Sequence, residues 1–352
     1  MKTFEIAVLA GDGIGPEVIA EAIKVVRAAA ARLTGVSFQF HELSAGATEY
    51  LRSGDPMPTS VFERARDCDA ILLGAMGLPD VRRPNGTEIA PQLDLREGLD
   101  LYAGLRPLRL YHSSHSPIKN CEAGDIDMLL VRENTEGLFF SRKEAFDAEA
   151  AHVDNTLRIS RRGSERLFRA AFQEAARRRG KVTLVDKSNV LPAMAYFRQI
   201  FDEVAQEFRE IRTEKVYIDA MALYLVQRPQ SFDVIVTENM FGDILSDLAA
   251  GLVGGMGMAP SGDIGESHAV FQPSHGSAPD IAGRGIANPV ATILSAAMML
   301  NWLKEPETEL AADAIRRAVE RVMGSDENRT RDLGGALSTK EMGDRIVAAL
   351  DL

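Results

Sequence analysis

Short apolar runs typical of β-strands alternate with longer helical stretches along the chain. The strand-like runs cover residues 4–9, 69–73, 126–131, 182–185 and 232–236. The helical stretches include residues 17–33, 165–178, 194–208, 243–252 and 289–303. This alternation is typical of a sheet with crossover helices, so the sequence predicts an α/β fold.

Polar and glycine-rich motifs follow directly after the strand-like runs, and they read GDGIG, GAMG, RENTEG, DKSN and TENMFGD. In open α/β sheets, ligands bind beyond the carboxyl ends of the strands. Most of the concentrated polar chemistry stands at these places, which predicts an enzyme.

The composition and net charge limit the kinds of molecule that the protein can bind. The 352 residues are 45% hydrophobic and 26% charged, which suffices for one large or two medium domains. The formal net charge of −11 repels phosphate backbones, so we expect no nucleic-acid partner. A small anionic substrate remains compatible, because a local arginine cluster can hold it inside an acidic protein.

Export and membrane insertion are not expected. No apolar run reaches the ~18 residues that a membrane span needs. The first residues enter a strand-like run at once and leave no room for a signal peptide. Cys68 and Cys121 are the only cysteines, without a metal-binding or redox motif, so we expect a reducing, cytoplasmic compartment.

An acidic set is the first candidate for binding chemistry. Asp243 and Asp247 are four residues apart, so a helix would place both carboxylates on one face. Their mutual repulsion would be offset by a hard divalent cation. Asp219, flanked by apolar residues in YIDAMALYL, is a third candidate. The simpler interpretation is a solvated helix face with two ordinary aspartates.

A basic set is the second candidate. Arg96, Arg106 and Arg132 lie in LDLREGL, AGLRPL and LLVRENTEG. Guanidinium groups form bidentate pairs with carboxylates, so several together would suit a di- or tricarboxylate. Arg132 is the most informative, because a charge after a strongly apolar run is costly without a partner. Surface arginines in structural ion pairs are the alternative.

Lys187 also follows an apolar run, in VTLVDKSNV. A lysine at such a place can act in proton transfer. A structural lysine that extends its charge to solvent is the alternative.

Two segments rich in small residues could contact a cofactor. GDGIGP, residues 11–16, follows the first strand and opens a helix, but its third glycine comes one residue early for the dinucleotide fingerprint. By itself it predicts only a tight turn. HGSAPDIAGRGIANP, residues 275–289, could wrap a cofactor, with Asp280 accepting hydrogen bonds from a ribose diol.

Together these segments resemble the metal-dependent isocitrate and isopropylmalate dehydrogenases. Eight strings match in the family's order over nearly the whole chain: GDGIGPEV, LDLREGLDLYAGLRP, VRENTEG, VDKSNVL, YIDAMA, FDVIVTENMFGDILSDLAAGL, HGSAPDIAGRGIANP and ILSAAMML. DLGGALST near the C-terminus is most similar to the isopropylmalate branch, whereas RENTEG is more similar to the isocitrate and tartrate/malate branches.

The resemblance implies a doubly wound α/β fold of the isopropylmalate dehydrogenase type, without the standard Rossmann fingerprint. It implies two domains: a cofactor-binding domain of residues 1–101 and 254–352, which holds both termini, and a central domain of residues 102–253 for substrate, metal and dimerisation. It further implies a homodimer whose active sites lie between the domains and are shared between subunits.

The resemblance also assigns roles at the matching positions. Arg96, Arg106 and Arg132 would bind the carboxylates of a small dicarboxylate substrate. The substrate site would be lined by one further residue, Gln92. Mg2+ or Mn2+ would be bound by Asp243, Asp247 and Asp219 of the partner subunit. Lys187 of the partner subunit would be the general base, so Lys187 and Asp219 are the predicted catalytic residues.

The cofactor expected from the resemblance is NAD. The residues that would bind it are His275, Gly276, Ser277, Ala278, Asp280, Ile281 and Asn288. The carboxylate of Asp280 would bind the ribose diol of NAD and repel the 2′-phosphate of NADP. Relatives that prefer NADP tend to carry lysine and tyrosine in place of Asp280 and Ile281.

Three residues depart from the family pattern. Phe139 stands where a tyrosine usually protonates the enolate after decarboxylation, so Tyr224 or a water must donate, or oxidation outruns decarboxylation. Gln92 replaces a leucine of the isopropylmalate enzymes, while Leu93 is kept. A buried amide beside an isopropyl group would lack a hydrogen-bond partner, so Gln92 favours a substrate with a more polar substituent. Gln272 replaces a glutamate near the nicotinamide and removes a charge.

The sequence thus predicts an NAD- and divalent-metal-dependent enzyme that oxidises and decarboxylates a 2-hydroxy dicarboxylic acid, either 3-isopropylmalate or a related 3-substituted malate. A tartrate/D-malate dehydrogenase on the same scaffold is the alternative that Gln92 and RENTEG favour. An alternative of another class is a non-catalytic paralogue that binds ligand without turnover, and Phe139 is its only support.

Overall fold

The computed structural model describes residues 2–144 and 149–351. Its strands are β1 (Lys2–Gly11), β2 (Val36–Glu42), β3 (Ala70–Ala75), β4 (Ala103–Arg109), β5 (Asp127–Glu133), β6 (Lys181–Asp186), β7 (Arg212–Tyr217), β8 (Val234–Thr237), β9 (Pro260–Ile264) and β10 (Ala269–Pro273). Its α-helices are α1 (Gly15–Ala30), α2 (Ala47–Ser53), α3 (Thr59–Arg66), α4 (Pro91–Gly98), α5 (Arg161–Ala176), α6 (Pro192–Ala205), α7 (Ile218–Gln227), α8 (Asn239–Gly251), α9 (Val290–Trp302), α10 (Pro306–Met323) and α11 (Thr339–Ala348). Short 3-10 turns are η1 (Ser113–His115), η2 (Leu138–Ser141), η3 (Pro229–Ser231), η4 (Met256–Met258) and η5 (Arg331–Leu333).

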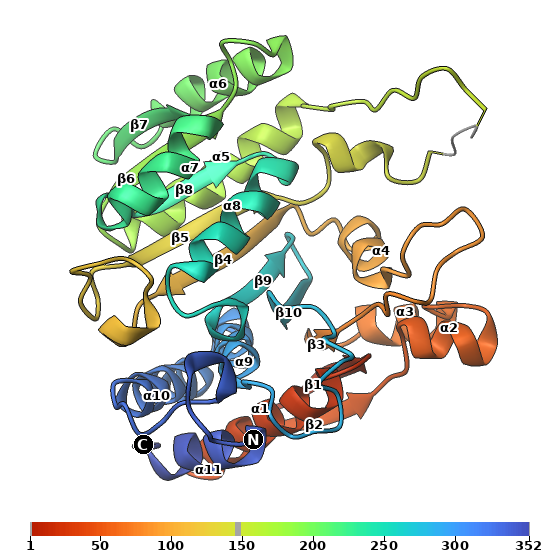
Figure 1. Cartoon of the computed structure of the whole chain (residues 1–352), viewed down its shortest axis with the longest axis vertical. Helices are drawn as coiled ribbons and strands as arrows, with labels where there is room; N and C mark the ends of the chain where they lie inside the picture. The colour runs from red at the N-terminus through yellow and green to blue at the C-terminus, as the bar shows by residue number, and fades with distance from the viewer. Residues whose placement is uncertain (1, 145–148, 352) are drawn as a thin grey trace.

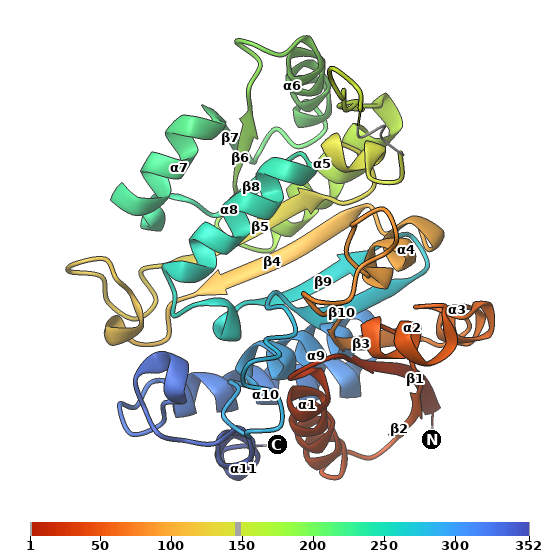
Figure 2. The same ribbon diagram turned by 45° about the vertical axis from the view of Figure 1, so that its right-hand side comes forward.

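The ten strands form one sheet in the order β2-β1-β3-β10-β9-β4-β5-β8-β6-β7. The strands β2, β1, β3 and β10 are parallel to one another, and so are β5, β8, β6 and β7. Two antiparallel central strands, β9 and β4, join the parallel halves. The sheet runs through the length of the molecule with helices around it (Figures 1 and 2), which confirms the α/β prediction.

The predicted elements are present, and two of the missed strands, β4 and β7, have a broken or a polar pattern. The five predicted strands correspond to β1, β3, β5, β6 and β8, and the five predicted helices to α1, α5, α6, α8 and α9. The missed strand β4 has the sequence AGLRPLR, in which glycine, proline and arginine interrupt the apolar pattern. The missed strand β7 lies at the sheet edge and is largely polar, RTEKVY.

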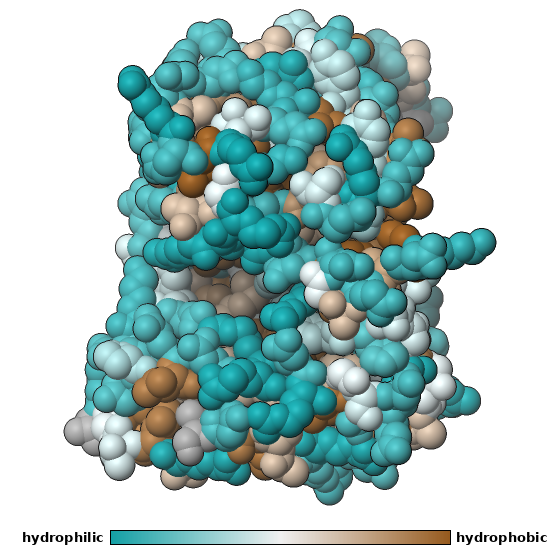
Figure 3. Space-filling view, turned by 90° about the vertical axis from the view of Figure 1, so that its left-hand side faces the viewer, coloured by the Kyte–Doolittle hydropathy of each residue, from teal (hydrophilic) through white to brown (hydrophobic). Residues whose placement is uncertain are grey.

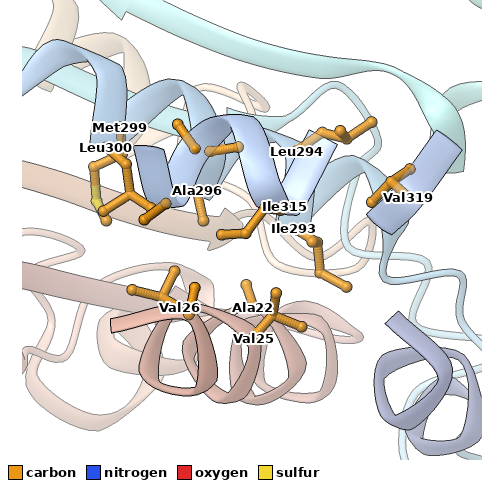
Figure 4. Packing of buried hydrophobic residues seen from close by; sticks show 14 of the residues in the cluster. Ala22, Val25, Val26, Ile293, Leu294, Ala296, Met299, Leu300, Ile315 and Val319 are labelled. Atoms are coloured by element: carbon orange, nitrogen blue, oxygen red, sulfur yellow. The ribbon is translucent and has the colours of Figure 1, made fainter. Parts of the chain in front are cut away.

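The N-terminal and C-terminal parts of the chain share one hydrophobic core. Val25 and Val26 of α1 pack in the same cluster as Ile293 of α9 and Ile315 of α10 (Figure 4). Helix α9 is buried along most of its length, which explains its nearly continuous apolar sequence. In this part of the molecule the chain begins with β1, beside β2, and ends after α11 (Figures 1 and 2).

Two further hydrophobic cores pack against β5 and β8. One cluster is built around Phe168, Phe172 and Phe201 of α5 and α6, and another around α7 and α8 on the opposite side of β5 and β8. No helix in the described ranges is long and apolar enough to cross a membrane. The face drawn in Figure 3 is mostly hydrophilic, with smaller apolar patches and a recess at mid-height.

Candidate active site

A cavity of about 230 Å3 lies where the two parallel halves of the sheet meet. It is lined by Gly74, Ala75, Met76, Gln92, Leu93, Arg96, Arg106, Arg132, Phe139, Asp243, Ser246, Asp247, Gln272, Pro273, Ser274, His275 and Gly276. All three arginines of the basic set and two aspartates of the acidic set therefore face one space. The motifs after β3, β5 and β8 contribute to this space, whereas GDGIG after β1 and DKSN after β6 do not.

Strand register explains how the arginines meet. Gly104 of β4 pairs with Arg132 of β5 on one side and with Asp263 of β9 on the other. Arg106 stands two residues along β4 and therefore points to the same face of the sheet. The third arginine, Arg96, reaches this face from α4. All three arginines are buried, so the alternative interpretation, that they are surface arginines, does not apply.

Asp263 is a site residue that the sequence analysis missed. Its carboxylate accepts a hydrogen bond from Nε of Arg96 at 2.9 Å and lies 3.6 Å from Nη1 of Arg106. Burial alone would raise the pKa of this carboxyl, but the charges of Arg96 and Arg106 outweigh burial and hold its pKa below the usual range. Asp263 lies on β9, whose Pro-Ser-Gly-Asp sequence lacks the apolar pattern of a strand, so the sequence analysis missed both the strand and this residue.

Arg132 is held by α8. Its Nε and Nη2 donate to Oδ1 of Asn239 at 3.0 and 2.7 Å, and its Nη1 pairs with Asp243. A Cβ at Gly242 would lie 2.6 Å from Cγ of Arg132, so glycine lets the helix approach the arginine stem. Burial lowers the pKa of Arg132 to about 10, and its ring neighbour Phe139 lies 5.2 Å from the guanidinium.

Asp243 and Asp247 lie one turn apart on α8, as the i, i+4 spacing predicts, and both face the cavity. Burial and the negative charge of Asp243 raise the pKa of Asp247. Two oxygen ligands on one helix face fit a hard cation. The described residues of one chain contain no group of three side chains able to hold a metal.

Lys187 and Asp219 do not line the cavity of their own chain. They pair with each other, with Nζ of Lys187 2.6 Å from Oδ1 of Asp219. The hydrogen bond from Lys187 lowers the pKa of Asp219. This pair lies at the end of β6 and the start of α7, and the Asp219 side chain is 68% exposed.

The segment 275–288, which we call the cofactor loop, is anchored to the turn after β1. The amide of Ile14 donates to the carbonyl of Ser277 at 2.8 Å, and the Ser277 hydroxyl donates to the carbonyl of Gly77 at 2.5 Å. Glu17 of α1 accepts hydrogen bonds from the amides of Gly283 and Gly285. The loop backbone is thus fixed while the Asp280 side chain stays exposed.

The glycine turn is structural. Gly13 has φ of +60°, and a Cβ there would lie 1.9 Å from the Ser277 carbonyl oxygen. Asp12 is buried and accepts hydrogen bonds from the amides of Ala47, Thr48 and Gly77. The turn therefore holds the cofactor loop and the start of α2, in accord with its departure from the dinucleotide fingerprint.

Other predicted cofactor residues flank the cavity or the base of the loop. His275 lines the cavity, its Nδ1 is 2.9 Å from the Gly276 carbonyl, and its buried Nε2 is unpaired among the described residues. Burial lowers the pKa of His275, so a neutral ring with an accepting Nε2 is favoured. Asn288 is buried and donates to Asp332 at 3.1 Å. Ile281 packs beside Ile14.

The three departures from the family pattern all face the cavity. Phe139 and Gln92 line it, and the Gln92 carbonyl oxygen is buried without a hydrogen-bond partner in the described structure. Gln272 donates from Nε2 to Oδ2 of Asp263 at 2.8 Å. A carboxylate is therefore present next to position 272, supplied by Asp263.

Known proteins are similar to this chain over nearly its whole length. A family model described as isocitrate/isopropylmalate dehydrogenase matches residues 5–346. The chain is 45% identical to a 3-isopropylmalate/3-methylmalate dehydrogenase of Methanocaldococcus jannaschii, covering 97% of each chain. It is 41% identical to a 3-isopropylmalate dehydrogenase of Aquifex aeolicus, covering 100% of this chain and 98% of that one.

Solved structures are similar over nearly the full length. An isocitrate dehydrogenase from Methylococcus capsulatus gives a TM-score of 0.87 at 37% identity, covering 98% of this chain and 99% of that one. A beta-decarboxylating dehydrogenase from Thermococcus kodakarensis gives 0.80 at 37% identity, covering 98% and 96%. The predicted fold class is confirmed, and the chain belongs to the isocitrate/isopropylmalate dehydrogenase family.

Proposed function

We propose that this protein catalyses the NAD- and divalent-metal-dependent oxidative decarboxylation of a 3-substituted malate. The observation that carries the proposal is the single cavity in which Arg96, Arg106 and Arg132 face Asp243 and Asp247. Such a site matches an anionic substrate held next to a cation. Relatives named for 3-isopropylmalate and 3-methylmalate support this substrate class.

Arg96 and Arg106 are the principal ligands for the substrate carboxylates in this proposal. Arg96 uses only Nε on Asp263, and in the described structure its two Nη groups make no hydrogen bond. Nη1 of Arg106 is buried, lies 3.6 Å from Asp263 and has no hydrogen-bond partner among the described residues. A buried guanidinium donor without a hydrogen-bond partner is costly, and a bound carboxylate would satisfy Nη1 of Arg106 while accepting from the Nη groups of Arg96.

Asp243 and Asp247 would hold Mg2+ or Mn2+, completed by Asp219 of the partner subunit. Bound there, the cation supplies Lewis-acid chemistry that lowers the pKa of the substrate 2-hydroxyl. Arg132, which pairs with Asp243 in this structure, would then be free to donate to substrate.

Lys187 of the partner subunit would accept the proton of the 2-hydroxyl, and NAD, when bound, would supply the acceptor for the hydride of C2. The resulting 2-oxo acid loses its C3-linked carboxylate as CO2, and the carbon left behind takes up a proton. Phe139 cannot supply this proton. Tyr224 lies on α7 beside Arg228 and does not line the cavity of its own chain. Because α7 would also carry the partner's Asp219, either Tyr224 of the partner subunit or a water would supply this proton.

NAD would bind along the cofactor loop. His275, Gly276, Ser277 and Ala278 would lie near the nicotinamide end. The ribose diol would be bound by Asp280. The exposed carboxylate of Asp280 supports NAD over NADP, because it would repel a 2′-phosphate.

A homodimer would unite the two halves of the site. Leu223 and Val226 on α7 and Ile244 on α8 are about half exposed, which is unusual for large apolar side chains. Asp219 lies one turn before Leu223 on α7, and Ile244 follows Asp243 directly on α8. An isologous interface over these helices would therefore bring one chain's Asp219 towards the other chain's Asp243.

The division into a cofactor-binding domain (1–101 and 254–352) and a central domain (102–253) remains a proposal. It is supported by the hydrophobic clusters, which group the chain-terminal segments apart from α5 to α8. A reducing, cytoplasmic setting is also proposed, and it agrees with the free thiols of Cys68 and Cys121.

A tartrate/D-malate type of activity is the second candidate. The Gln92 carbonyl oxygen, which has no hydrogen-bond partner in the described structure, favours it, because the second hydroxyl of a tartrate could donate to this oxygen. A non-catalytic paralogue is less well supported, since a ligand binder needs neither Lys187 nor the paired aspartates.

The test is NADH formation with Mg2+ or Mn2+ across 3-isopropylmalate, 3-methylmalate, D-malate, the tartrates and isocitrate, with CO2 counted in parallel. We expect turnover of a 3-substituted malate that stops when the metal is chelated. Preference for D-malate or a tartrate would favour the second candidate, and inactivity across the panel would contradict the proposed function.

A further inference from the structure

Asp263 on β9 is the only carboxylate among the described residues that contacts two of the three cavity arginines. It is 1% exposed and does not itself line the cavity. One oxygen accepts from Arg96 at 2.9 Å and from Gln272 at 2.8 Å, and the other accepts from Asn134 at 2.8 Å and lies 3.6 Å from Arg106.

The surroundings of Asp263 are built for a carboxylate. A Cβ at Gly104, the neighbour of Asp263 across β4 and β9, would lie 2.9 Å from the Asn134 amide nitrogen. Glycine at this position makes room for the amide that donates to Asp263. Every group around the carboxylate is a donor, and a buried charge persists only with such partners.

The charges around the cavity balance because of Asp263. Three guanidinium groups face three carboxylates, of which Asp243 and Asp247 line the cavity and Asp263 stands behind the arginines. A divalent cation added to this set would leave two positive charges among the groups of this chain, which a dicarboxylate neutralises. The pair of Lys187 and Asp219 that the partner subunit would contribute is an ion pair and adds no net charge. A tricarboxylate would leave one buried negative charge without compensation, which is unfavourable at low dielectric.

We infer that Asp263 is a positioning and specificity-determining residue, which orients Arg96 and Arg106 and restricts the cavity to dicarboxylates. The inference rests on the proposed function for its substrate class. Asp263 acts through the arginines, because it does not reach the cavity surface.

The first test is D263N, which keeps the side-chain volume and removes the charge. We expect the preference for isocitrate over 3-isopropylmalate, measured as the ratio of their dissociation constants by calorimetry with Mg2+ present, to rise about tenfold or more. We also expect KM for the dicarboxylate to rise more than kcat falls, because the arginines lose their fixed orientation.

The second variant, D263N/Q272E, transfers the carboxylate from position 263 on β9 to its hydrogen-bond partner, position 272 on β10. The net charge stays the same. The bond between positions 263 and 272 can persist with donor and acceptor exchanged. We expect this variant to return the binding ratio to within about threefold of the original protein, since the charge near the arginines is restored.

D233N is the matched control. Asp233 is 2% exposed and accepts from Nε of Arg178 at 2.9 Å, but it does not line the cavity. D233N should lower thermal stability and leave the binding ratio unchanged. A ratio for D263N within twofold of the original protein, or no recovery in D263N/Q272E, would overturn the inference.

Binding measurements keep this inference separate from the proposed function. A protein that turns over no 3-substituted malate would contradict the proposed function, while the ratio of dissociation constants still decides the role of Asp263. Conversely, an active enzyme whose ratio is insensitive to D263N would retain the proposed function and lose the inference.

Discussion

Phe139 is the residue whose chemistry differs most from what the family resemblance implies. Its ring lines the cavity and lies against the Arg132 guanidinium, so it occupies the substrate side of the site. A phenyl ring there shields the arginine from water but has no proton to donate. The carbon left after CO2 loss must therefore take its proton from a group other than residue 139.

Restoring a hydroxyl at this position should couple the two chemical steps. We predict that Phe139→Tyr raises the ratio of CO2 to NADH towards one if the original protein releases part of its 2-oxo acid undecarboxylated, because the new hydroxyl can protonate the enolate. The ratio is measured by counting CO2 against NADH absorbance.

Phe140→Tyr is the control, since Phe140 stacks on Arg158 and does not line the cavity. A ratio that starts below one and does not change in Phe139→Tyr would contradict the prediction. A ratio of one in the original protein would show that another donor already serves.

At the scale of elements, the glycine turn after β1 and the cofactor loop form one unit. Gly13→Ala should displace the loop, because its Cβ would overlap the Ser277 carbonyl, and should also strain a backbone at positive φ. We predict that KM for NAD rises about tenfold and that the melting temperature falls. Steady-state kinetics and thermal unfolding measure the two effects.

Gly54→Ala separates strain from overlap. Gly54 also has a positive φ of +82°, but a Cβ there would meet nothing within 4 Å. This control should lose some stability and keep its KM for NAD. Equal effects of both substitutions on KM would mean that the turn does not position the loop.

The elements also show what sequence patterns can and cannot predict. Apolar runs located β1, β3, β5, β6 and β8 because buried parallel strands are continuously apolar. They missed β4 and β9, the antiparallel centre of the sheet, because glycine, proline and the charged residues at and behind the cavity interrupt the apolar pattern there. Functional residues thus concealed the strands that carry them.

The candidate site was predicted where a motif was local. The spacing of Asp243 and Asp247 was sufficient to place both on one helix face. Asp263 could not be predicted in the same way, since its partners Arg96 and Asn134 are more than a hundred residues away in sequence. Its proximity to Arg106 depends on the pairing of β4 with β9, which only the fold determines.

At the scale of the whole molecule, a shared site can be tested by mixing two defective proteins. Lys187→Met and Asp243→Asn should each abolish most activity. After the subunits are unfolded together and refolded as an equal mixture, we predict recovery of about a quarter of the original activity, because half of the dimers would contain one intact site. Sedimentation should show the dimer in all samples.

The same mixing with Lys187→Met and Lys181→Met is the control. Lys181 pairs with Glu214 at the far end of β6, so Lys181→Met should be active by itself. The activity of this mixture should not exceed the mean of the activities of the two separate proteins. No recovery with Asp243→Asn would indicate that each chain completes its own site.

Stability of the whole fold should depend on the protonation of Glu133. Burial raises the pKa of this carboxyl to about 7, although it accepts hydrogen bonds from Thr135 and Glu136. The folded state therefore favours the protonated form. The contribution of Glu133 to stability is fully present below its ordinary value near 4.5 and is lost as pH rises through about 7.

We predict that Glu133→Gln makes the melting temperature less dependent on pH between 5 and 8, because the amide has no proton to lose. Glu49→Gln is the control, since the pKa of Glu49 is lowered to about 2, mainly by its hydrogen bond from Arg52, and it should lower stability equally at both pH values. An unchanged slope for Glu133→Gln would place the pH dependence elsewhere.

The anchoring of the cofactor loop has a consequence for engineering. Its backbone is fastened at Ser277, Gly283 and Gly285 by groups that belong to the scaffold, whereas the side chain of Asp280 makes no hydrogen bond within the described structure. Exposed side chains of the loop can therefore be replaced without removing the hydrogen bonds that hold its backbone. Under the proposed function, directed evolution of the dinucleotide preference would need only a small library at the exposed positions of this loop.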